Sequence, residues 1–424
     1  MTSAPAAPTA PHPPEPDLTP QEMIARAIAL RPKLIAQQAE TEQRTYHSEE
    51  LHRDFVDAGF YRLYVPRRYG GYEFDVPTYM RITQELARGC VSTGWCEGLA
   101  AAHALQIASW WPERAQIEIF GDGDFRAASV AAPIGTATRV DDGWELNGRV
   151  SYCSGIPYST HYMGQALIAG EDGQPTERMI LFVAPRSEFT VLDDWGALLG
   201  LKGSGSQSIV FEGGRIPAHW AIEDALMVDF DVSRGTAGLA LHGNPMYGGR
   251  ALAHFTMSLG AVMVGAAYQA LDEYELLMDS KMTALPPIQP RRFDADYQRW
   301  FGSAHAKVAT AEAALYNCAD QHMELCRRAA EGARYSYGDD MRLGCIAREV
   351  MIQAWEVMQG EIFRTAGSSA GAAGQRMERI YRDMSIGNSH RNTVLREWAF
   401  GELARELLGL PRSGPGNVQK PHPG

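Results

Sequence analysis

Long hydrophobic runs are missing from this sequence of 424 residues. No apolar stretch approaches the roughly 18 residues that a membrane-spanning helix needs, so a membrane is not an expected partner. Basic residues are also in deficit, since 39 Lys and Arg stand against 51 Asp and Glu, giving a formal net charge of −12. Nucleic acids attract clustered positive charge and no basic block occurs, so nucleic acid is not an expected partner either.

Cysteines are few and widely spaced. The six are Cys90, Cys96, Cys153, Cys318, Cys326 and Cys345. Without CxxC pairs or a dense framework, they indicate reduced thiols, which are typical of the cytoplasm. No second metal-ligating residue lies at the spacing of a metal site from His242 or His322. No metal site is therefore predicted.

Common nucleotide-binding and nucleophile motifs are absent as well. The sequence has no strand–GxGxxG–helix unit, no GxxxxGKS/T loop and no GxSxG elbow. In other proteins, the first two motifs bind dinucleotides and nucleoside triphosphates, and the third positions a serine nucleophile. Nothing in the chain is therefore predicted to bind NAD(P)H, and a separate protein would have to use it.

The first 19 residues are dominated by proline and alanine, without the basic start and apolar middle of a signal peptide. They predict a disordered arm over 1–19. Thr19-Pro20-Gln21-Glu22 then combines an N-cap residue, a proline at the first helical position and an acid in the first turn. This combination predicts that a helix begins there.

Three blocks of different periodicity follow. Helical spacing of apolar residues covers 20–124, short β-rich runs between Asp-Gly and Asn-Gly turns cover 125–230, and helical spacing returns over 231–424. The predicted fold class is α+β, mainly α, with a central antiparallel β-domain. The long helices of the last block are expected at 251–277, 297–332, 338–365 and 388–408.

Four motifs occur in a fixed order along the chain. They are FYRLYVP at 60–66 followed by YGG at 69–71, WGALLGLKGSGS at 195–206, FEGGRIP at 211–217 and YRD at 381–383. Together with the helix–strand–helix order, they resemble the acyl-CoA dehydrogenase family across roughly residues 20 to 410. The resemblance implies an N-terminal helical domain, a central β-barrel-like domain and a C-terminal four-helix bundle.

The catalytic base of the dehydrogenases has no counterpart in this sequence. In that family, a Tyr-Glu-Gly-Thr-like segment supplies the glutamate that removes a substrate α-proton. Here the segment is SHRNT at 389–393, and counting from Asp383 places Arg391 at the position of the glutamate. A guanidinium has a pKa above ~12 and cannot act as a base near neutral pH, so the dehydrogenase chemistry is predicted to be lost.

Three further features resemble the oxygenase components of two-component flavin-dependent monooxygenases, such as the 4-hydroxyphenylacetate 3-hydroxylase large component. They are Trp95 and His103 in STGWCEGLAAAH, the turn GRVSYCSG at 148–155, and His390, eight residues after Arg382. After Gly155 the sequence IPYSTHY departs from that branch. Substrate contacts in that segment are therefore not carried over.

The resemblance implies oxygenation of a small aromatic or heteroaromatic substrate by reduced FMN or FAD and O₂, through a flavin C4a-hydroperoxide. A separate NAD(P)H:flavin reductase would supply the reduced flavin, and the family's assembly implies a homotetramer. Carbon, sulfur and nitrogen oxygenation all stay open, as does the choice between FMN and FAD.

The candidate catalytic residues are His390, His103 and Ser154. A neutral imidazole can deprotonate or hydrogen-bond a phenol, so His390 is assigned to substrate activation or peroxide stabilisation and His103 to orienting the substrate. Ser154 is assigned to the flavin locus. The predicted cofactor-binding residues are Trp95, Ser151, Ser154, Gly155, Trp195, Gly203, Ser204 and Arg292, the last on an arm that the fold directs towards a neighbouring subunit's flavin phosphates.

Two other functions stay open. A flavin oxidase or dehydrogenase would need another base, for which Glu212 and Asp383 are the candidates, whereas a degenerate scaffold member would need none. The histidines also have structural interpretations, because His103 shares an apolar helical stripe with Trp95 and His390 could cap a helix.

Overall fold

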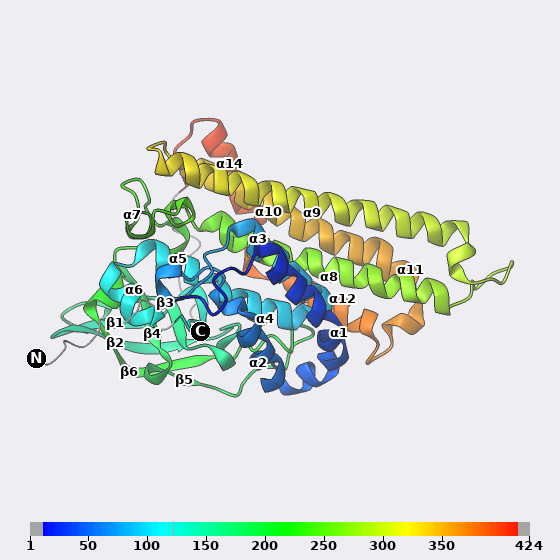
Figure 1. The fold of residues 1–424 in the computed structure, drawn as a ribbon, viewed down its shortest axis with the longest axis horizontal. Helices are drawn as coiled ribbons and strands as arrows, with labels where there is room; N and C mark the ends of the chain where they lie inside the picture. Colours follow the sequence, from blue (N-terminus) through cyan, green and yellow to red (C-terminus); the bar gives the residue numbers. More distant parts are fainter. Residues whose placement is uncertain (1–11, 122, 414–424) are drawn as a thin grey trace, which may run out of the picture.

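The computed structural model of the protein describes residues 12–121 and 123–413. A helical block, a central sheet and a bundle of long helices follow one another along the chain, as the colour gradient in Figure 1 shows. The predicted fold class, α+β with a helical majority, is confirmed. In the described part of the chain, no helix is long and apolar enough to cross a membrane.

The N-terminal block is helical, and its first helix begins where the capping residues predict. The Thr19 side chain accepts a hydrogen bond from the Glu22 N–H, and the Glu22 carboxylate accepts one from the Thr19 N–H. The helices are α1 (Pro20–Arg44), α2 (Glu49–Ala58), α3 (Val76–Gly89), α4 (Val91–Ala102), α5 (Ala104–Trp110) and α6 (Glu113–Phe120).

Only part of the predicted N-terminal arm can be compared with the structure. Residues 1–11 lie outside the described residues. In the remainder of the arm, Leu18 is buried and Glu15 pairs with Arg26 at 2.6 Å. The last residues of the arm therefore pack on the helical block.

The central domain is one seven-stranded sheet in the order β5-β6-β2-β1-β3-β4-β7. Its strands are β1 (Ala127–Val140), β2 (Gly143–Val150), β3 (His161–Ala169), β4 (Pro175–Pro185), β5 (Thr190–Val191), β6 (Ile209–Pro217) and β7 (Ala221–Glu223). The prediction of antiparallel pairing holds for every neighbouring pair except β1 and β3, which are parallel.

The parallel pair follows from how the chain leaves β2. Strands β2 and β3 pair with opposite edges of β1, so the chain between them crosses the end of β1 instead of forming a hairpin. That crossing, residues 151–160, contains Ser151 and Ser154.

Helices, several of them long, return after the sheet. They are α7 (Ala237–His242), α8 (Leu252–Ser280), α9 (Ala295–Ala330), α10 (Tyr337–Val357), α11 (Arg364–Ala366), α12 (Arg376–Asn388), α13 (Arg391–Val394) and α14 (Arg396–Leu407). Helix α8 is buried along most of its length because it packs against α3, α9, α10 and α12.

Two of the predicted long helices are interrupted. The helix expected at 338–365 is α10, a π-helical turn at Met358–Phe363, and α11. The helix expected at 388–408 was wrong at its start, because α12 ends at Asn388 and His390 has an extended backbone. The His390 side chain stabilises this break by accepting a hydrogen bond from the Asn392 N–H at the start of α13.

The Tyr-Arg-Asp run lies in α12 and ties the bundle to the β-domain. Asp383 is buried and accepts hydrogen bonds from the Leu201 N–H at 2.6 Å and from the Ser92 hydroxyl at 3.1 Å. Gly200 approaches the same helix so closely that a Cβ would lie 2.1 Å from the Arg382 carbonyl oxygen. These contacts hold the 195–206 loop against α12.

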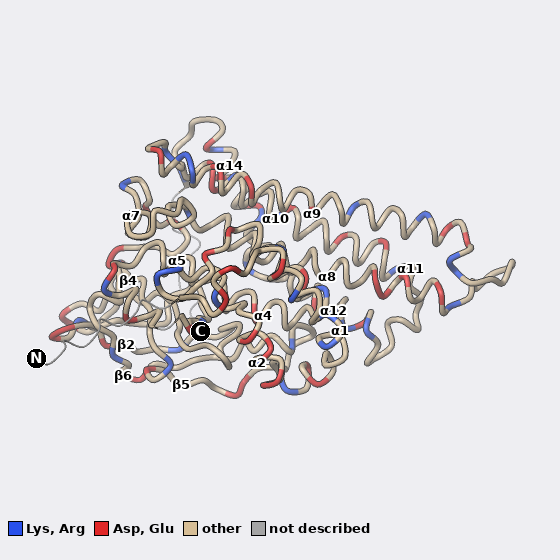
Figure 2. Tube along the Cα trace, in the orientation of Figure 1, with Lys and Arg blue, Asp and Glu red and all other residues tan. Residues whose placement is uncertain are grey.

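Charged residues are interspersed along the helices, and Figure 2 shows both Lys or Arg and Asp or Glu at scattered positions along the bundle. Some of them join elements far apart in sequence. Arg88 pairs with Asp272 at 2.6 Å and links α3 to α8, while Arg382 pairs with Glu42 at 2.9 Å and links α12 to α1.

Candidate active site

A cavity of about 330 Å³ lies where the three blocks meet. Its wall is built from the α4–α5 junction, strand β1, the 151–160 crossing, helices α8 and α10, and the segment around α13. His103, Ser154 and His390 all line it. The structure therefore brings the three predicted catalytic residues together.

His103 occupies the junction between α4 and α5. Its Nδ1 lies 2.7 Å from the Ala127 carbonyl oxygen, and a carbonyl only accepts, so Nδ1 carries the proton. Nε2 is then the unprotonated nitrogen and a hydrogen-bond acceptor. Burial lowers the pKa of the ring to about 4, so His103 is neutral at physiological pH.

His390 presents the opposite nitrogen. Its Nδ1 accepts a hydrogen bond from the Asn392 N–H at 3.2 Å, so the neutral ring carries its proton on Nε2. The ring meets Trp95 edge-on, with centroids 5.5 Å apart, and its exposed surface opens into the cavity. Desolvation by the surrounding protein lowers the pKa of His390 to about 4, which makes it a neutral donor.

Trp95, Ser154 and Ser206 form a hydrogen-bonded chain at one wall of the cavity. The Trp95 Nε1–H donates to Ser154 Oγ at 3.1 Å, and the hydroxyls of Ser154 and Ser206 lie 2.8 Å apart. Gly155 permits this arrangement, since its φ is +83° and a Cβ would lie 2.8 Å from the Cys96 carbonyl oxygen. The turn is thereby held against α4.

A second cavity, of about 180 Å³, adjoins the first, because Tyr152 lines both. Two of the predicted cofactor-binding residues, Ser151 and Trp195, line it. The Ser208 hydroxyl donates to Ser151 Oγ at 2.8 Å. Tyr152 is 62% exposed and meets Trp195 edge-on at 5.4 Å, so an accessible aromatic ring stands between the cavities.

Five predicted cofactor-binding residues do not line either cavity, namely Trp95, Gly155, Gly203, Ser204 and Arg292. Gly203 and Ser204 are buried, and the Ser204 hydroxyl donates to the Leu201 carbonyl oxygen at 2.8 Å. Arg292 lies in the connection between α8 and α9, where it pairs with Asp279 at 2.7 Å. Ser204 Oγ also lies 2.7 Å from Ser206 Oγ and so joins the hydrogen-bonded chain of Ser154 and Ser206, whereas Arg292 is engaged away from both cavities.

Neither of the alternative bases faces a cavity. Glu212 is exposed on β6, and Asp383 is held by its hydrogen bonds to the 195–206 loop and α4.

Arg391, by contrast, lines the larger cavity. The two carboxylates in that wall are Asp229, which pairs with arginines, and Glu402, which accepts hydrogen bonds from the chain near the C-terminus.

Sequence reasoning missed Arg348 and Asn392, which both line the larger cavity. The Arg348 Nε–H donates to the Asn392 carbonyl oxygen at 3.0 Å. A signal for Arg348 does exist, because it falls in the buried stripe of α10 at helical spacing. The stripe consists of Met341, Cys345, Arg348 and Ile352.

Two family models match the chain. The acyl-CoA dehydrogenase N-terminal domain matches residues 20–111, and the acyl-CoA dehydrogenase C-terminal domain matches residues 257–394. Together they cover more than half of the sequence. The chain belongs to the acyl-CoA dehydrogenase family.

Relatives of this acyl-CoA dehydrogenase family member include named monooxygenase components. The flavin-dependent monooxygenase oxygenase subunit HsaA of Rhodococcus jostii is 26% identical over 371 residues, covering 87% of this chain and 93% of its own. The p-hydroxyphenylacetate 3-hydroxylase oxygenase component of Acinetobacter baumannii is 24% identical over 409 residues, covering 94% and 92%. The similarity therefore extends over nearly the whole of each chain.

Solved structures of other proteins share the fold. The HsaA monooxygenase of M. tuberculosis aligns with a TM-score of 0.83 at 24% identity, covering 94% of this chain and 99% of its own. XiaF of a Streptomyces species, in complex with FADH₂ and glycerol, aligns with a TM-score of 0.84 at 22% identity, covering 93% and 97%. These alignments establish the same acyl-CoA dehydrogenase-like architecture.

Proposed function

We propose that this protein is the oxygenase component of a two-component flavin-dependent monooxygenase that oxygenates a small aromatic or heteroaromatic compound. One observation carries the proposal: two neutral histidines of opposite hydrogen-bonding character, His103 as acceptor and His390 as donor, line one cavity with Ser154. The relatives named as monooxygenase oxygenase components support the same function.

The residues around the two cavities fit a flavin. Ser154, which lines the larger cavity, and Ser206, which lines the smaller one, are hydrogen-bonded to each other. A hydroxyl can both donate and accept, so these side chains suit the edge of a flavin ring, along which donors and acceptors alternate. The exposed ring of Tyr152 adds a flat apolar surface. When bound, a reduced flavin supplies the activation of O₂.

Phosphate binding calls for a cation that the smaller cavity does not supply. Its lining contains Asp194, whose carboxylate pairs with Arg149 at 2.9 Å, and includes neither Lys nor Arg. An arginine suits phosphate because its planar fork can bind two oxygens at once. Arg292 of a neighbouring subunit therefore stays our candidate for this role.

His103 receives the proton of the substrate's hydroxyl group. Its Nε2 is an acceptor because Nδ1 donates to Ala127. Burial lowers the pKa of His103 to about 4, which makes the ring a weak base. It accepts a hydrogen bond from the substrate at first, and takes the proton only as the substrate reacts.

His390 donates a hydrogen bond from Nε2 to an oxygen that gains negative charge in the cavity. The Asn392 N–H fixes its tautomer, and the edge contact with Trp95 fixes the orientation of its ring. A donor placed in advance stabilises developing charge without further reorganisation. The apolar wall, including Leu99, Leu252 and Phe255, excludes water from the same region.

Partners follow from the same proposal. With no motif for NAD(P)H in the sequence, a separate NAD(P)H:flavin reductase supplies the reduced flavin. All six cysteines are buried and unpaired, which suits the reducing cytoplasm. Large exposed apolar side chains in the α8–α9 connection support assembly as a homotetramer.

Anaerobic stopped-flow spectroscopy tests the proposed function. The protein is mixed with reduced FMN or FAD and then with O₂, with and without a phenol. We expect a transient absorbing species distinct from reduced and oxidised flavin, followed by one oxygenated product for each O₂ consumed. Immediate flavin oxidation with stoichiometric H₂O₂ in the wild type, for every phenol tried, would overturn the proposal.

Variants at His390 sharpen this test. His390→Ala removes the donor and should shorten the lifetime of the transient by about 10²- to 10³-fold, with O₂ diverted to H₂O₂. His390→Gln keeps an N–H donor and should retain part of the lifetime. His305→Ala, on the exposed side of α9, is the matched control and should behave as the wild type.

A further inference from the structure

Arg348 is a buried cation that forms no ion pair with any of the described residues. It lies on α10, is 2% exposed, and lines the larger cavity. Its Nε–H donates to the Asn392 carbonyl oxygen at 3.0 Å, while Nη1 is buried without a hydrogen-bond partner among the described residues. Most other buried arginines of proteins are paired, so this one needs an explanation.

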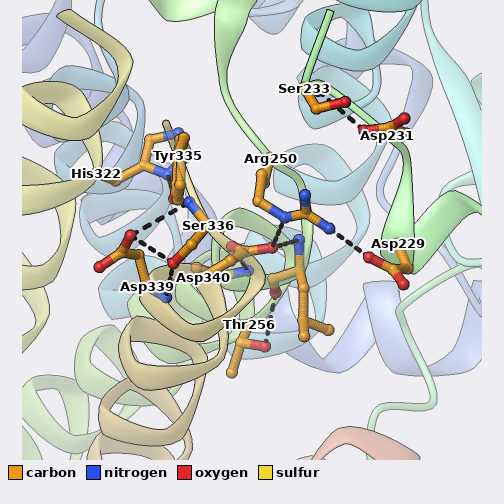
Figure 3. Close-up of polar contacts among 12 residues, drawn as sticks. Asp229, Asp231, Ser233, Arg250, Thr256, His322, Tyr335, Ser336, Asp339 and Asp340 are labelled. Carbon is orange, nitrogen blue, oxygen red and sulfur yellow. Dashed lines mark hydrogen bonds and ion pairs between the residues drawn. The ribbon is translucent and has the colours of Figure 1, made fainter. Parts of the chain in front are cut away.

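The buried acid Asp340 acts on Arg348 electrostatically but forms no ion pair with it. Asp340 accepts hydrogen bonds from two backbone N–H groups at the start of α8, at 2.9 and 3.3 Å, and it pairs with Arg250 at 3.5 Å. Figure 3 shows the Arg250 guanidinium lying between Asp340 and Asp229 and directed towards both. The carboxylates of Asp340 and Asp229 therefore compensate the charge of Arg250.

The carboxylates of the cavity wall are engaged as well. Asp229 pairs with two arginines, and Glu402 accepts from the Ser413 N–H at 3.2 Å. Against these two acids, the wall carries three arginines, which leaves a formal excess of one positive charge. The arginines are Arg348, Arg391 and Arg412.

A guanidinium withdrawn from water destabilises the protein unless acceptors or an opposite charge compensate it. Desolvation lowers the pKa of Arg348, which reflects that lack of compensation. The planar guanidinium presents its donors in a fork that matches two oxygens of one anionic group. Because Arg348 lines the cavity, a ligand that brings such a group there would place an opposite charge beside the guanidinium.

We propose that Arg348 binds an oxyanion, in the simplest case a carboxylate, that the aromatic substrate carries. This assignment rests on the proposed function, because it names the class of substrate for that cavity. Asn392 connects the new subsite with the reacting end: its carbonyl accepts from Arg348 and its N–H donates to His390. The oxyanion therefore binds beside the residue that donates to the reacting oxygen.

Calorimetric titration of the flavin-free protein tests the subsite independently of catalysis. Matched pairs serve as probes: 4-hydroxybenzoate, 4-hydroxyphenylacetate and 3-(4-hydroxyphenyl)propanoate, each against its primary amide. Because a charge-assisted hydrogen bond is worth more than a neutral one, at least one acid should bind about 10- to 100-fold more tightly than its amide. Equal affinities within about threefold for all three pairs would overturn the proposal.

Substitutions test whether the preference for an acid over its amide depends on Arg348. Arg348→Gln should reduce it to about threefold or less, whereas Arg348→Lys, which keeps a charge, should retain part of it. Arg299→Gln removes an exposed arginine of α9 that does not line the cavity, and it should leave the preference in place. Persistence of the full preference in a folded Arg348→Gln variant would contradict the assignment, and if that variant does not fold, the wild-type pairs alone decide.

The two proposals fail in different ways. If acids bind preferentially but the wild type never yields oxygenated product, the subsite stands and the monooxygenase function falls. If neutral phenols are oxygenated while no acid is preferred, the function stands and the Arg348 subsite falls.

Discussion

Two histidines of one cavity differ because the backbone occupies a different nitrogen of each ring. The Ala127 carbonyl oxygen accepts from His103 Nδ1, whereas the Asn392 N–H donates to His390 Nδ1. Desolvation keeps both rings neutral, with pKa values of about 4. A proton can therefore be accepted at one point and offered at another without either ring being charged beforehand.

His103→Asn should convert a flat pH profile into a rising one. In the wild type the pKa of about 4 keeps the acceptor available from pH 6 to 9. The Asn N–H can still donate to Ala127, but no base remains, so turnover depends on substrate already ionised in solution. The rate should fall by about 10²- to 10⁴-fold at pH 7 and rise about tenfold per pH unit towards the phenol pKa of ~10.

Single-turnover product formation measured from pH 6 to 9 checks this prediction. The affinity for reduced flavin, titrated in parallel, serves as the control for a structural effect. A variant profile as flat as that of the wild type would assign His103 to structure rather than to proton transfer.

A second prediction for a single residue concerns Glu97 and the dependence of protein stability on pH. The residue is 1% exposed, its Oε1 has no hydrogen-bond partner in the described chain, and burial raises its pKa from 4.5 to about 8. From pH 4.5 to 8 the native carboxyl retains a proton that the unfolded one has lost. Stability from this group is therefore lost as pH rises through that window, by on the order of 4 kcal/mol in total.

Glu97→Gln removes the titration and should abolish this loss. We expect the melting temperature of the wild type to fall between pH 6.5 and 8.5 while that of the variant stays nearly level. Glu397→Gln, at an exposed position of α14, is the control and should follow the wild type. Parallel curves for the wild type and Glu97→Gln would show that Glu97 is not held protonated.

At the scale of elements, the 151–160 crossing depends on one glycine. Gly155 has φ +83°, and a Cβ there would lie 2.8 Å from the Cys96 carbonyl oxygen of α4. Gly155→Ala should therefore move the turn away from α4 and cost about 1–3 kcal/mol of unfolding free energy. Because Ser154 moves with the turn, affinity for reduced flavin should fall about tenfold or more.

Denaturant unfolding and a flavin titration measure both effects. The matched control is Gly302→Ala on α9, where nothing lies within 4 Å of the added Cβ. That substitution in an open helical position should stabilise the protein by about 0.5–1 kcal/mol and leave flavin binding unchanged. Unchanged flavin affinity in a folded Gly155→Ala variant would separate the turn from the cofactor site.

Local signals in the sequence predicted some elements and not others. The start of α1 at Thr19 follows from its capping residues, which act over one turn. The break between α12 and α14 was missed, because it is stabilised by His390, which caps α13 and packs on the distant Trp95. Likewise, no local pattern reveals that β3 pairs in parallel with β1.

The candidate site shows the same division. His103, His390 and Ser154 could be predicted from motifs, and the structure places them in one cavity. Ser204 lies in a motif too, yet its hydroxyl turns inward to Leu201, because tertiary contacts set side-chain directions within a loop. Arg348 lies in no motif, and only its burial and missing partner reveal it.

For the whole molecule, periodicity was enough to predict the order of helical, sheet and helical blocks. The cavity forms where these blocks meet, from segments around residues 103, 154, 348 and 390. Which side chains face that space depends on the crossing between β2 and β3 and on the tie between α12 and the 195–206 loop. Both are long-range features that arise only when the blocks pack together.

Assembly is the last prediction, and it concerns the α8–α9 connection at the far end of the bundle (Figure 1). Leu285 is 76% exposed and Phe293 is 65% exposed there, beside the exposed Met282 and Ile288. Large exposed apolar side chains gathered in one connection indicate an interface. We expect sedimentation equilibrium to give a homotetramer, in which these side chains are covered by another copy.

The double variant Leu285→Asp/Phe293→Asp should shift the protein to smaller species. Burying such a side chain contributes about 1.5–3 kcal/mol, so losing two per subunit weakens association by at least about 100-fold. Ile117→Asp, at a 53% exposed position of α6, is the control and should not change the mass. If the double variant stays tetrameric, the connection does not hold the assembly together, and Arg292 beside it loses its route to a neighbouring subunit's flavin.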